Sequence, residues 1–306
     1  MVDRKRAQTG GSSVAPSALP HGGRAQSDAD PLVLRVLTMN IWNFDGPYEA
    51  RQRMLREGIE KLQPDLMAFQ EAGYDGHRDQ VRDLLRGLDR VAHQFDGLKS
   101  LPFNNGCCIA SRWPFELMET LSLQVTERAK KYPYAAMAAR VAVPGTPRPL
   151  LFVCAKPSWE LNREYERELQ AVELAKMVQR LARREDLPTV IAGDFDAAPD
   201  RASIRFLTGR QSLAGLSVQY IDAWEHAGDG SSGATWSYEN KMALGEMERI
   251  GCGQQSRRID YVFVGSWHDY AGAPEVRSCR VVLNKPQSGV WPSDHYALLA
   301  EIAVRP

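Results

Sequence analysis

Residues 189–196 read Thr-Val-Ile-Ala-Gly-Asp-Phe-Asp, an apolar run that is followed by two aspartates. This pattern is the starting point for predicting the fold. A nearly continuous apolar run is typical of a strand that is buried on both faces of its sheet. Residues 32–39 form a second such run, which ends at Asn40, and residues 66–69 form a third, which is soon followed by Glu71. Strands of this type predict a layered α/β domain in which helices cover the sheets.

The rest of the chain interleaves strands with helices. Apolar side chains follow helical spacing over residues 54–62, and a longer helix is expected over residues 162–183. Further strands are expected at residues 107–111, 135–143, 150–155, 259–264 and 296–303. Neither a fixed-period repeat nor a linker interrupts residues 32–304, so we expect one domain over that range.

Residues 1–31 differ from the rest of the chain in composition. Eleven of the 31 are Gly, Pro or Ser, and only Val2, Val14 and Leu19 are sizeable aliphatic residues. Such a segment buries too little apolar surface to offset the entropy that is lost on ordering. We therefore expect residues 1–31 to be a disordered leader.

The composition of the 306 residues, with 43% hydrophobic and 25% charged residues, excludes wholesale disorder and fibrous structure. The 38 basic and 38 acidic residues give a formal charge of zero, which disfavours a protein that only coats nucleic acid. No run approaches the roughly 18 apolar residues of a membrane span, and the chain begins without a signal-peptide core. The expectation is a cytoplasmic monomer without a membrane span.

The cysteines do not form a recognisable framework. They are Cys107, Cys108, Cys154, Cys252 and Cys279, an odd number without Cys-x-x-Cys spacing. This pattern predicts neither a set of disulfides nor a zinc site. Buried thiols in a reducing compartment are the simplest interpretation.

Polar side chains stand where the predicted strands end. These residues are Asn40, Glu71, Asp194, Asp196, Asp260, Asp294 and His295. Turn formation explains an isolated Asp or Asn at a strand end, but five such ends together indicate one rim at which carboxylates converge. Carboxylate oxygens suit Mg²⁺ or Mn²⁺. A cation, a carboxylate base and a histidine are what the hydrolysis of a phosphate ester requires.

Five short motifs carry these polar residues. They are Thr38-Met39-Asn40-Ile41-Trp42, Pro64-Asp65-Leu66 with Gln70-Glu71, Gly193-Asp194-Phe195-Asp196, Arg258-Ile259-Asp260-Tyr261 and Ser293-Asp294-His295. In this order and at these intervals they resemble the motifs of the endonuclease/exonuclease/phosphatase superfamily, which includes deoxyribonuclease I. The resemblance covers residues 32–304. It implies a four-layer α/β sandwich, with two mixed β-sheets packed face to face and helices outside, and an enzyme that cleaves phosphoesters with Mg²⁺ or Mn²⁺.

The resemblance also assigns metal-binding roles. Glu71 would be the principal metal carboxylate. Asn40 would bind the metal beside it or order the metal's ligands. Asp294 would add a carboxylate near the metal, through water.

The catalytic roles that the resemblance implies fall on three further residues. Asp194 would be the base that positions and deprotonates the attacking water. Asp260 would hold the ring of His295, and His295 would contact the scissile phosphate. A carboxylate that holds an imidazole fixes both its tautomer and its orientation.

Two positions depart from the family pattern. Asp196 stands where the family usually has Asn, and an ionised carboxylate there can only accept hydrogen bonds. Two close carboxylates raise the pKa of one of them unless a cation compensates. Lys156 stands where the family's strand ends in His; lysine keeps a positive charge but is a poor acid near neutrality. We therefore expect Lys156 to act as an electrostatic clamp on the phosphate.

Three functions fit these residues. The first is a divalent-metal-dependent hydrolase that cleaves phosphodiesters or phosphomonoesters by water attack. The second, favoured by Lys156 and Asp196, is a degenerate family member that binds a phosphorylated ligand or partner with little or no catalysis. The third is a hydrolase of a different ester or bond. The substrate stays open between nucleic acid and a small phosphorylated molecule.

Three tryptophans lie close to the motifs. Trp159 follows Lys156 by three residues, Trp291 precedes the Ser-Asp-His motif, and Trp236 belongs to a predicted rim loop. Packing in the core or at the rim is the commoner use of such residues. Stacking on a base or sugar of the substrate is the alternative.

Overall fold

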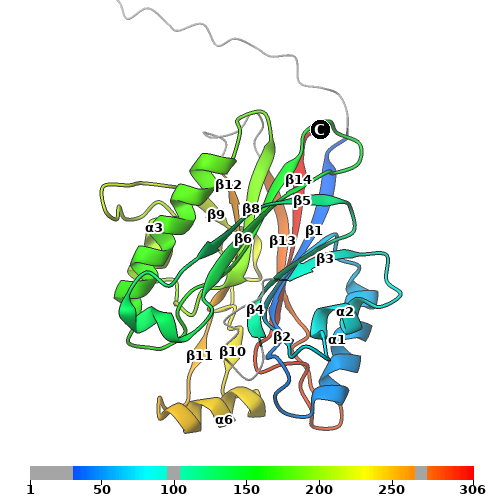
Figure 1. The fold of residues 1–306 in the computed structure, drawn as a ribbon, viewed down its shortest axis with the longest axis vertical. Coiled ribbons are helices and arrows are strands. Elements are labelled where there is room, and N and C mark those ends of the chain that lie inside the picture. Colours follow the sequence, from blue (N-terminus) through cyan, green and yellow to red (C-terminus); the bar gives the residue numbers. More distant parts are fainter. Residues whose placement is uncertain (1–29, 95–103, 266–273) are drawn as a thin grey trace, which may run out of the picture.

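The computed structural model describes residues 30–94, 104–265 and 274–306, and arranges them in four layers of helix, sheet, sheet and helix (Figure 1). The predicted fold class, a four-layer α/β sandwich, is confirmed. Residues 1–29, which make up most of the predicted leader, lie outside the described residues.

The first sheet has six strands in the order β13-β14-β1-β2-β4-β3. In that order they span Glu275–Val282, Ala297–Val304, Leu32–Asn40, Leu66–Tyr74, Asn104–Ser111 and Val91–Gln94. Strands β1 and β2 are parallel, whereas the other neighbours are antiparallel. The sheet is therefore mixed, as the family resemblance implies.

The second sheet has the order β5-β6-β7-β8-β12-β9. In that order its strands span Phe115–Ser122, Ala135–Val141, Leu150–Lys156, Leu187–Asp194, Asp260–Gly265 and Tyr220–Asp222. Here β7 and β8 form the parallel pair, and the other neighbours are antiparallel. The two sheets thus share one plan, with a parallel pair in the middle of each.

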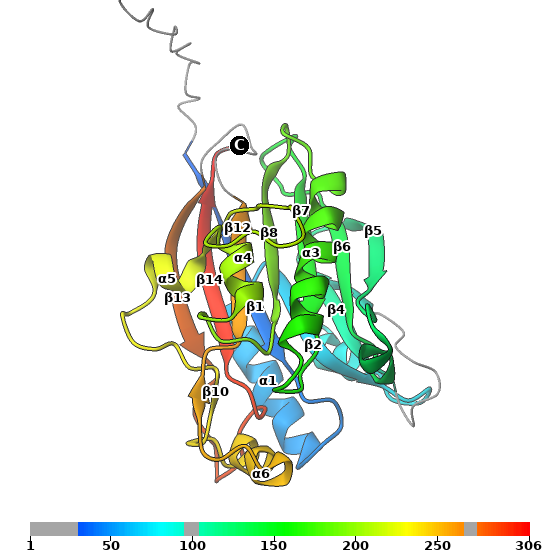
Figure 2. The same ribbon diagram turned by 90° about the vertical axis from the view of Figure 1, so that its left-hand side faces the viewer.

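Helices cover the outer face of each sheet. Helices α1 (Tyr48–Leu62) and α2 (Gln80–Leu85) lie on the first sheet, and α3 (Glu164–Leu181) and α4 (Ala202–Leu207) lie on the second (Figure 2). The short helix α5 (Ala223–Ala227) packs near β13, and the 3-10 helix η1 (Glu127–Lys131) precedes β6. Within the part of the chain that is described, no helix is long and apolar enough to cross a membrane.

The layered arrangement explains the continuous apolar runs of the sequence. In β8, Val190 and Ala192 pack into the core between the two sheets, whereas Ile191 between them packs beneath α3 and α4. Both faces of the strand are therefore buried, and each residue needs an apolar side chain whichever way it points. The apolar run ends where the strand ends, at Asp194, which is itself buried.

A small two-stranded sheet and one helix project from the lower end of the sandwich in Figure 1. Strands β10 (Trp236–Ser237) and β11 (Ser256–Arg257) are antiparallel, and α6 (Lys241–Ile250) connects them. A separate apolar cluster holds this unit together, made of Trp236, Ala243, Met247 and Ile259. Because Ile259 directly precedes β12, the unit is joined to the second sheet.

Gly193 lies where β7 and β8 approach closely. It pairs with Ala155, and a Cβ atom at position 193 would lie 2.2 Å from the carbonyl oxygen of Ala155. That oxygen belongs to the backbone and cannot turn aside. Glycine is therefore required here, and the close approach brings Lys156 next to Asp194, the residues that follow the pair.

We expect Gly193→Ala to destabilise the protein by about 1–3 kcal/mol, the usual cost of forcing extra atoms into a packed interior. The strands must separate to admit the methyl group, because its nearest neighbour is backbone. The free energy of unfolding, measured by urea denaturation, checks this expectation.

Gly245→Ala is the matched control. Gly245 lies inside α6, and a Cβ atom there has open space around it to 4 Å. We expect this change to be neutral or to stabilise the helix by about 0.5–1 kcal/mol. Equal unfolding midpoints for the two variants would contradict the close approach at Gly193.

Candidate active site

The predicted site residues meet at one edge of the sandwich, because the parallel strands of both sheets end there. Asn40 is the last residue of β1, Lys156 of β7 and Asp194 of β8. Strand β12 runs the opposite way and begins at that edge with Asp260, which pairs with Asp194. Side chains that are distant in sequence therefore lie within hydrogen-bonding distance of one another.

Glu71 is turned toward this edge by an irregularity in β2. The register between β2 and β4 shifts between Phe69 and Ala72, and Glu71 has a left-handed φ of 52°. A bulge of this kind redirects one side chain out of the regular alternation. As a result, Oε1 of Glu71 lies 3.6 Å from Nζ of Lys156, and 23% of the Glu71 side chain is exposed.

Lys156 lies among the acidic side chains. Its Nζ donates to Oδ2 of Asp194 at 2.6 Å and to Oδ2 of Asp196. Burial lowers the pKa of Lys156, but Asp194 and Asp196 outweigh this effect and raise it well above its ordinary value. Only 7% of Lys156 is exposed. Lys156 is therefore a fixed positive charge at the site and not a solvent-facing lysine.

Asp194 is held as a carboxylate by several donors. Nδ2 of Asn40 donates to its Oδ2 at 3.0 Å, and the backbone N–H of Asp196 donates to its Oδ1 at 3.1 Å. Burial raises the pKa of Asp194, but the charges of Lys156 and His295 outweigh burial and lower it. Burial and the Asp194 charge raise the pKa of Asp196. Lys156 is thus the cation that allows the two aspartates to lie close together.

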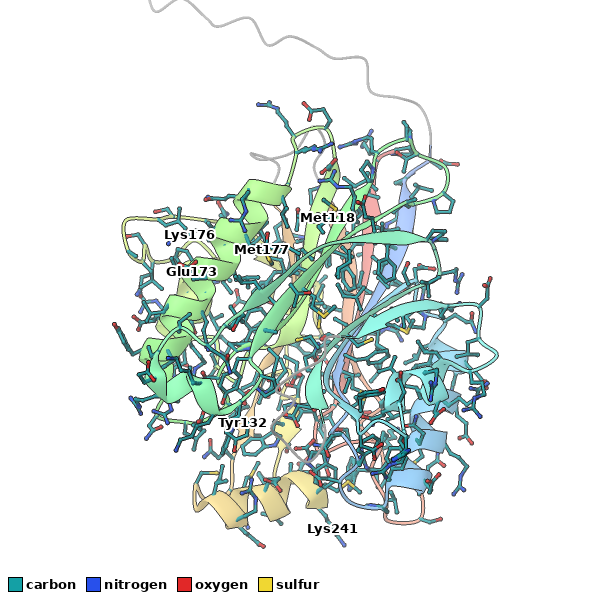
Figure 3. All side chains as sticks on the ribbon, viewed as in Figure 1. Met118, Tyr132, Glu173, Lys176, Met177 and Lys241 are labelled. Atoms are coloured by element: carbon teal, nitrogen blue, oxygen red, sulfur yellow. The ribbon has the colours of Figure 1, made fainter. Side chains whose placement is uncertain are left out.

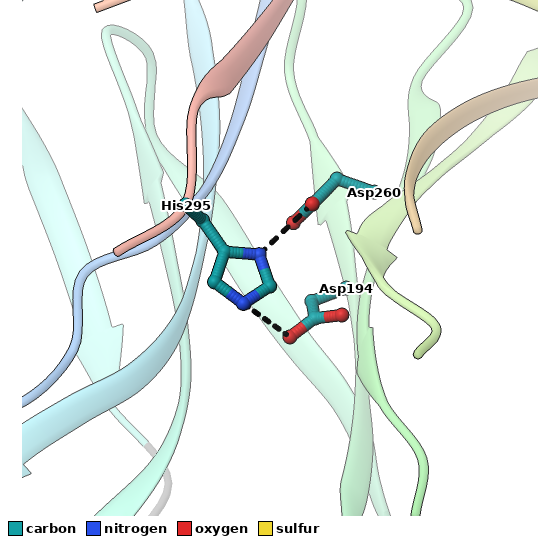
Figure 4. Close-up of side chains that lie close together, drawn as sticks. All are labelled: Asp194, Asp260 and His295. Atoms are coloured by element: carbon teal, nitrogen blue, oxygen red, sulfur yellow. Dashed lines mark hydrogen bonds and ion pairs between the residues drawn. The ribbon is translucent and has the colours of Figure 1, made fainter. Parts of the chain in front are cut away.

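His295 lies between two aspartates (Figure 4). Its Nδ1 is 3.0 Å from Oδ2 of Asp260, and its Nε2 is 3.9 Å from Oδ2 of Asp194. Burial lowers the pKa of His295, but Asp260, Asp194 and Asp294 outweigh it and raise the pKa well above its ordinary value. Both ring nitrogens therefore face carboxylate oxygens, whose charges favour the protonated ring, in which Nδ1 donates to Asp260.

Asp194, Asp260 and His295 also have potential ligand atoms within 4.8 Å of one another. Their atoms are already engaged, because Nδ1 of His295 faces Asp260 and the Asp194 carboxylate accepts from Lys156 and Asn40. Neither Asp194 nor Asp260 lines the cavity, so the carboxylates that do line it are better placed for a metal ion.

Glu71 and Asp294 are the carboxylates suited to a metal ion. Both line the cavity at this edge. Burial and the charge of Glu71 raise the pKa of Asp294 to about 7, against the opposing effect of His295. Two oxygen donors that repel each other at a cavity wall are what a hard divalent cation prefers. The residues present therefore fit Mg²⁺ or Mn²⁺.

Asn40 takes a different position from these two carboxylates. Its Nδ2 donates to Asp194, its Oδ1 accepts the backbone N–H of Trp42 at 2.9 Å, and 1% of it is exposed. It is not among the residues that line the cavity. In this arrangement Asn40 orients the Asp194 carboxylate.

Two buried residues hold the loops of the site although no sequence motif marks them. Oγ1 of Thr235 accepts the backbone N–H of Asp260 at 3.2 Å. Nδ2 of Asn240 donates to the carbonyl oxygens of Ser293 at 2.8 Å and Asp294 at 3.1 Å. Both residues belong to the unit that carries α6. This unit therefore holds both the segment that contains Asp260 and the segment that leads to His295. Only their contacts in three dimensions reveal this function.

The backbone is strained around the cavity. Trp42, Asn43, Glu71 and Asp196 all line it, and all have a positive φ, between 33° and 52°. They are four of the eight non-glycine residues with positive φ in the described part of the chain. Such conformations cost free energy and are concentrated at functional sites, so their clustering supports this cavity as the active site.

The cavity has a volume of about 600 Å³. Its floor contains Glu71, Lys156, Asp196, Asp294 and His295, whereas Asp194 and Asp260 are fully buried behind it. Aromatic residues and α6 form the walls, including Trp42, Tyr132, Tyr134, Trp159, Trp236 and Arg249. A cavity of this size admits an organic ligand as well as a phosphoryl group.

The chain belongs to the Endonuclease/Exonuclease/phosphatase family, whose pattern it matches over residues 37–295. The family predicted from the sequence motifs is thereby confirmed. The matched range begins inside β1 and ends at His295, so it contains every site residue described above.

Individual relatives are distant. Protein angel of Drosophila melanogaster is 22% identical over 267 residues, which are 84% of this chain and 72% of that protein. The human Nocturnin catalytic domain with bound sulfate anion has a TM-score of 0.64 at 19% identity and covers 90% of this chain and 94% of that chain. D. rerio TDP2 complexed with single strand DNA product has a TM-score of 0.66 at 18% identity, covering 88% and 98%. These structures share the fold.

Proposed function

We propose that this protein is a divalent-metal-dependent hydrolase of phosphoesters. One observation carries the proposal: the side chains of Asp194, Lys156 and His295 converge where Glu71 and Asp294 line the same cavity. Two structural relatives, one with a bound sulfate anion and one complexed with single strand DNA product, support an oxyanion ligand for this chain.

Glu71 and Asp294 would hold the metal ion, Mg²⁺ or Mn²⁺. When bound, the ion would offset the charge of the phosphate and make water more acidic. Asp294 is supported in that position by the hydroxyl of Ser293, which donates to its Oδ1 at 3.1 Å.

Asp194, His295 and Lys156 would each have a separate role in the hydrolysis. The Asp194 carboxylate, whose direction Asn40 and Lys156 fix, would accept the proton of the attacking water, which must reach it behind the cavity floor. As the water oxygen bonds to phosphorus, the ester P–O bond breaks, and the leaving oxygen takes its proton from solvent. His295, held by Asp260, donates from Nε2 to a phosphoryl oxygen on which charge builds. Lys156 adds a second positive charge beside it. Its raised pKa makes it a poor proton donor, so it stabilises charge and does not protonate the leaving group.

The proposal is tested with bis-(p-nitrophenyl) phosphate in the presence of Mg²⁺ or Mn²⁺. We expect release of p-nitrophenol that stops when the metal is chelated and returns when it is restored. Glu71→Ala is the blank. Metal-independent release at an equal rate from the protein and from Glu71→Ala would contradict the proposal.

A second function has one observation in its favour. Lys156 already bonds to both Asp194 and Asp196, so the proposed base has a cation beside it before any substrate arrives. A protein of this kind would bind a phosphorylated ligand with little turnover. Binding of phosphate or p-nitrophenyl phosphate without product release, at saturating Mn²⁺, would favour this alternative.

The position of Lys156 also bears on the number of metal ions. Its ammonium bonds to Asp194 and Asp196, the carboxylates that a second cation would need, and offsets part of their charge. Its contact with Glu71 is longer, at 3.6 Å, so Glu71 and Asp294 are left for one ion. We therefore expect the protein to bind one Mn²⁺, and Lys156→Met to bind two, because Met fills the space without the charge. Isothermal titration with Mn²⁺ measures both numbers.

Lys130→Met is the control for this measurement. Lys130 belongs to η1, is exposed and pairs with Glu127, away from the residues that line the cavity. It should bind one Mn²⁺ like the unmodified protein. If Lys156→Met is folded and still binds one ion, Lys156 does not stand in for a second cation.

A further inference from the structure

The cavity beside the reaction centre has an aromatic wall. Tyr132 lies 5.7 Å from Tyr134 and 5.8 Å from Trp159, measured between ring centroids. The three rings form one continuous cluster, and all three line the cavity. Figure 3 shows Tyr132 above α6, the helix that begins at Lys241.

The pairing of β6 with β7 puts this wall next to the catalytic residues. Ala135, the first residue of β6, pairs with Lys156, the last residue of β7. The segments that contain Tyr132 and Trp159 therefore leave the sheet side by side, within a few residues of the Lys156 ammonium. A group bound against these rings would be joined to a phosphoryl group at Lys156 by only a few bonds.

The wall is held in place, yet one ring stays uncovered. The hydroxyl of Tyr134 donates to Oε2 of Glu160 at 2.8 Å, and Trp159 packs against the core beneath α3. Tyr132 remains 37% exposed. An aromatic ring that is fixed at a cavity wall and still open to solvent offers a surface on which another planar ring can stack.

The charges of the residues that line the cavity limit how many phosphate groups the ligand can carry. The acidic lining residues are Asp45, Glu71, Asp196, Glu246 and Asp294, and the basic ones are Lys156, Arg249, Arg257 and His295. Each basic side chain already has a partner: the two arginines bond to Glu246 and to the carbonyl oxygen of Asp196. The lining therefore offers no surplus of positive charge for a second phosphate group.

We propose that the cavity binds a phosphoester with one phosphoryl group and an uncharged planar ring a few bonds away, and that the ring stacks on Tyr132. This substrate class rests on the hydrolase function proposed above. A nucleoside monophosphate and an aryl-substituted alkyl phosphate both have this chemistry, and so does the terminal nucleotide of a nucleic-acid strand.

The test compares benzyl phosphate with cyclohexylmethyl phosphate, using the full chain and Mg²⁺. Both esters lose a primary alcohol from one phosphoryl group, and their six-membered rings differ mainly in planarity and aromaticity. We expect kcat/KM to be about five- to tenfold higher for benzyl phosphate, the range that stacking on one aromatic side chain supplies. Equal values for the two esters would overturn the proposal.

Variants at Tyr132 test whether the preference for benzyl phosphate arises from the aromatic wall. Tyr132→Phe keeps the ring and should keep the preference, whereas Tyr132→Leu should reduce the ratio to about one. Tyr165→Leu is the matched control, because Tyr165 lies in α3, is 63% exposed and does not line the cavity. A preference that survives in Tyr132→Leu would overturn the assignment of the wall.

Binding of the corresponding phosphonates separates this proposal from the proposed function. Benzylphosphonate and cyclohexylmethylphosphonate have a C–P bond in place of the ester and are not hydrolysed. Tighter binding of benzylphosphonate, lost in Tyr132→Leu, supports the aromatic wall even if no ester is cleaved. Turnover of both esters without any such preference would support the hydrolase function and contradict ring stacking on Tyr132.

A competition experiment distinguishes the sources of the ring. Thymidine 5′-monophosphate and a 5′-phosphorylated dodecanucleotide that ends in thymidine present the same terminal group. Because the cavity lacks surplus positive charge, the monophosphate should compete with benzyl phosphate at a lower concentration. A dodecanucleotide that competes tenfold better would overturn the single-phosphoryl class.

Discussion

Glu71→Gln is expected to lower cation-dependent turnover by roughly 10³-fold, the upper end of what the loss of one charge-stabilising contact costs. The change removes one of the two carboxylates that line the cavity and suit a divalent ion. It alters neither the size of the side chain nor the bulge that directs it. The measurement is kcat/KM for bis-(p-nitrophenyl) phosphate over a series of Mg²⁺ concentrations.

The fold of Glu71→Gln should be intact, because the side chain is partly exposed and the loss of its 3.6 Å ion pair with Lys156 is offset by the loss of repulsion with Asp294. Its melting temperature should equal or exceed that of the unmodified protein. Glu116→Gln makes the same chemical change at an exposed position of β5 and should retain full activity. Normal turnover in a folded Glu71→Gln protein would remove Glu71 from the metal site.

Lys156→Met is expected to reduce turnover by about 10²-fold at a Mg²⁺ concentration just sufficient for the unmodified protein. The variant loses the positive charge beside the phosphate. It also leaves Asp194 and Asp196 buried without their common partner, and removing one partner of a buried ion pair costs about 3–5 kcal/mol. Turnover and the free energy of unfolding should therefore both fall.

Two further substitutions at position 156 separate charge from geometry. Lys156→Arg keeps the charge and should retain part of both the activity and the stability. Lys156→His places at this position the residue type of the family pattern. It should be active and gain a pH dependence near neutrality, because imidazole titrates there and lysine ordinarily does not. If Lys156→Met turns over substrate at the rate of the unmodified protein, the proposed clamp is wrong.

Local sequence pattern predicts a layered α/β domain, whereas the four-layer arrangement of two sheets was implied by the resemblance of the motifs to those of a known family. Strands such as β1, β7 and β8 are buried on both faces, so their apolar runs are visible without knowledge of their neighbours. Strands β5 and β13 lie at the edges of their sheets, where β5 has no buried residue and β13 has only Val276 and Cys279 buried. Their pattern is weaker for this reason, and the sequence does not predict them.

The acidic and basic residues at the strand ends are also visible in the sequence, because each of them lies beside or within an apolar run. What the sequence cannot supply is the direction of each side chain. Glu71 depends on a bulge, and Lys156 depends on a close approach of two backbones at Gly193. Both are properties of strand pairing between segments distant in sequence, so no local pattern contains them.

The contacts of Lys156 and the walls of the cavity were decided by tertiary structure alone. The sequence predicts Lys156 as an electrostatic clamp on the phosphate, and the folded protein adds that its ammonium bonds to Asp194 and Asp196 at the cavity floor. Tyr132 comes from a loop without any motif, and it reaches the cavity because β6 and β7 are paired. Local sequence pattern thus predicts a layered α/β domain and the chemical groups of the site, and the family resemblance supplied the number of layers. Tertiary structure decided which groups meet, because strand register and packing set the distances between them.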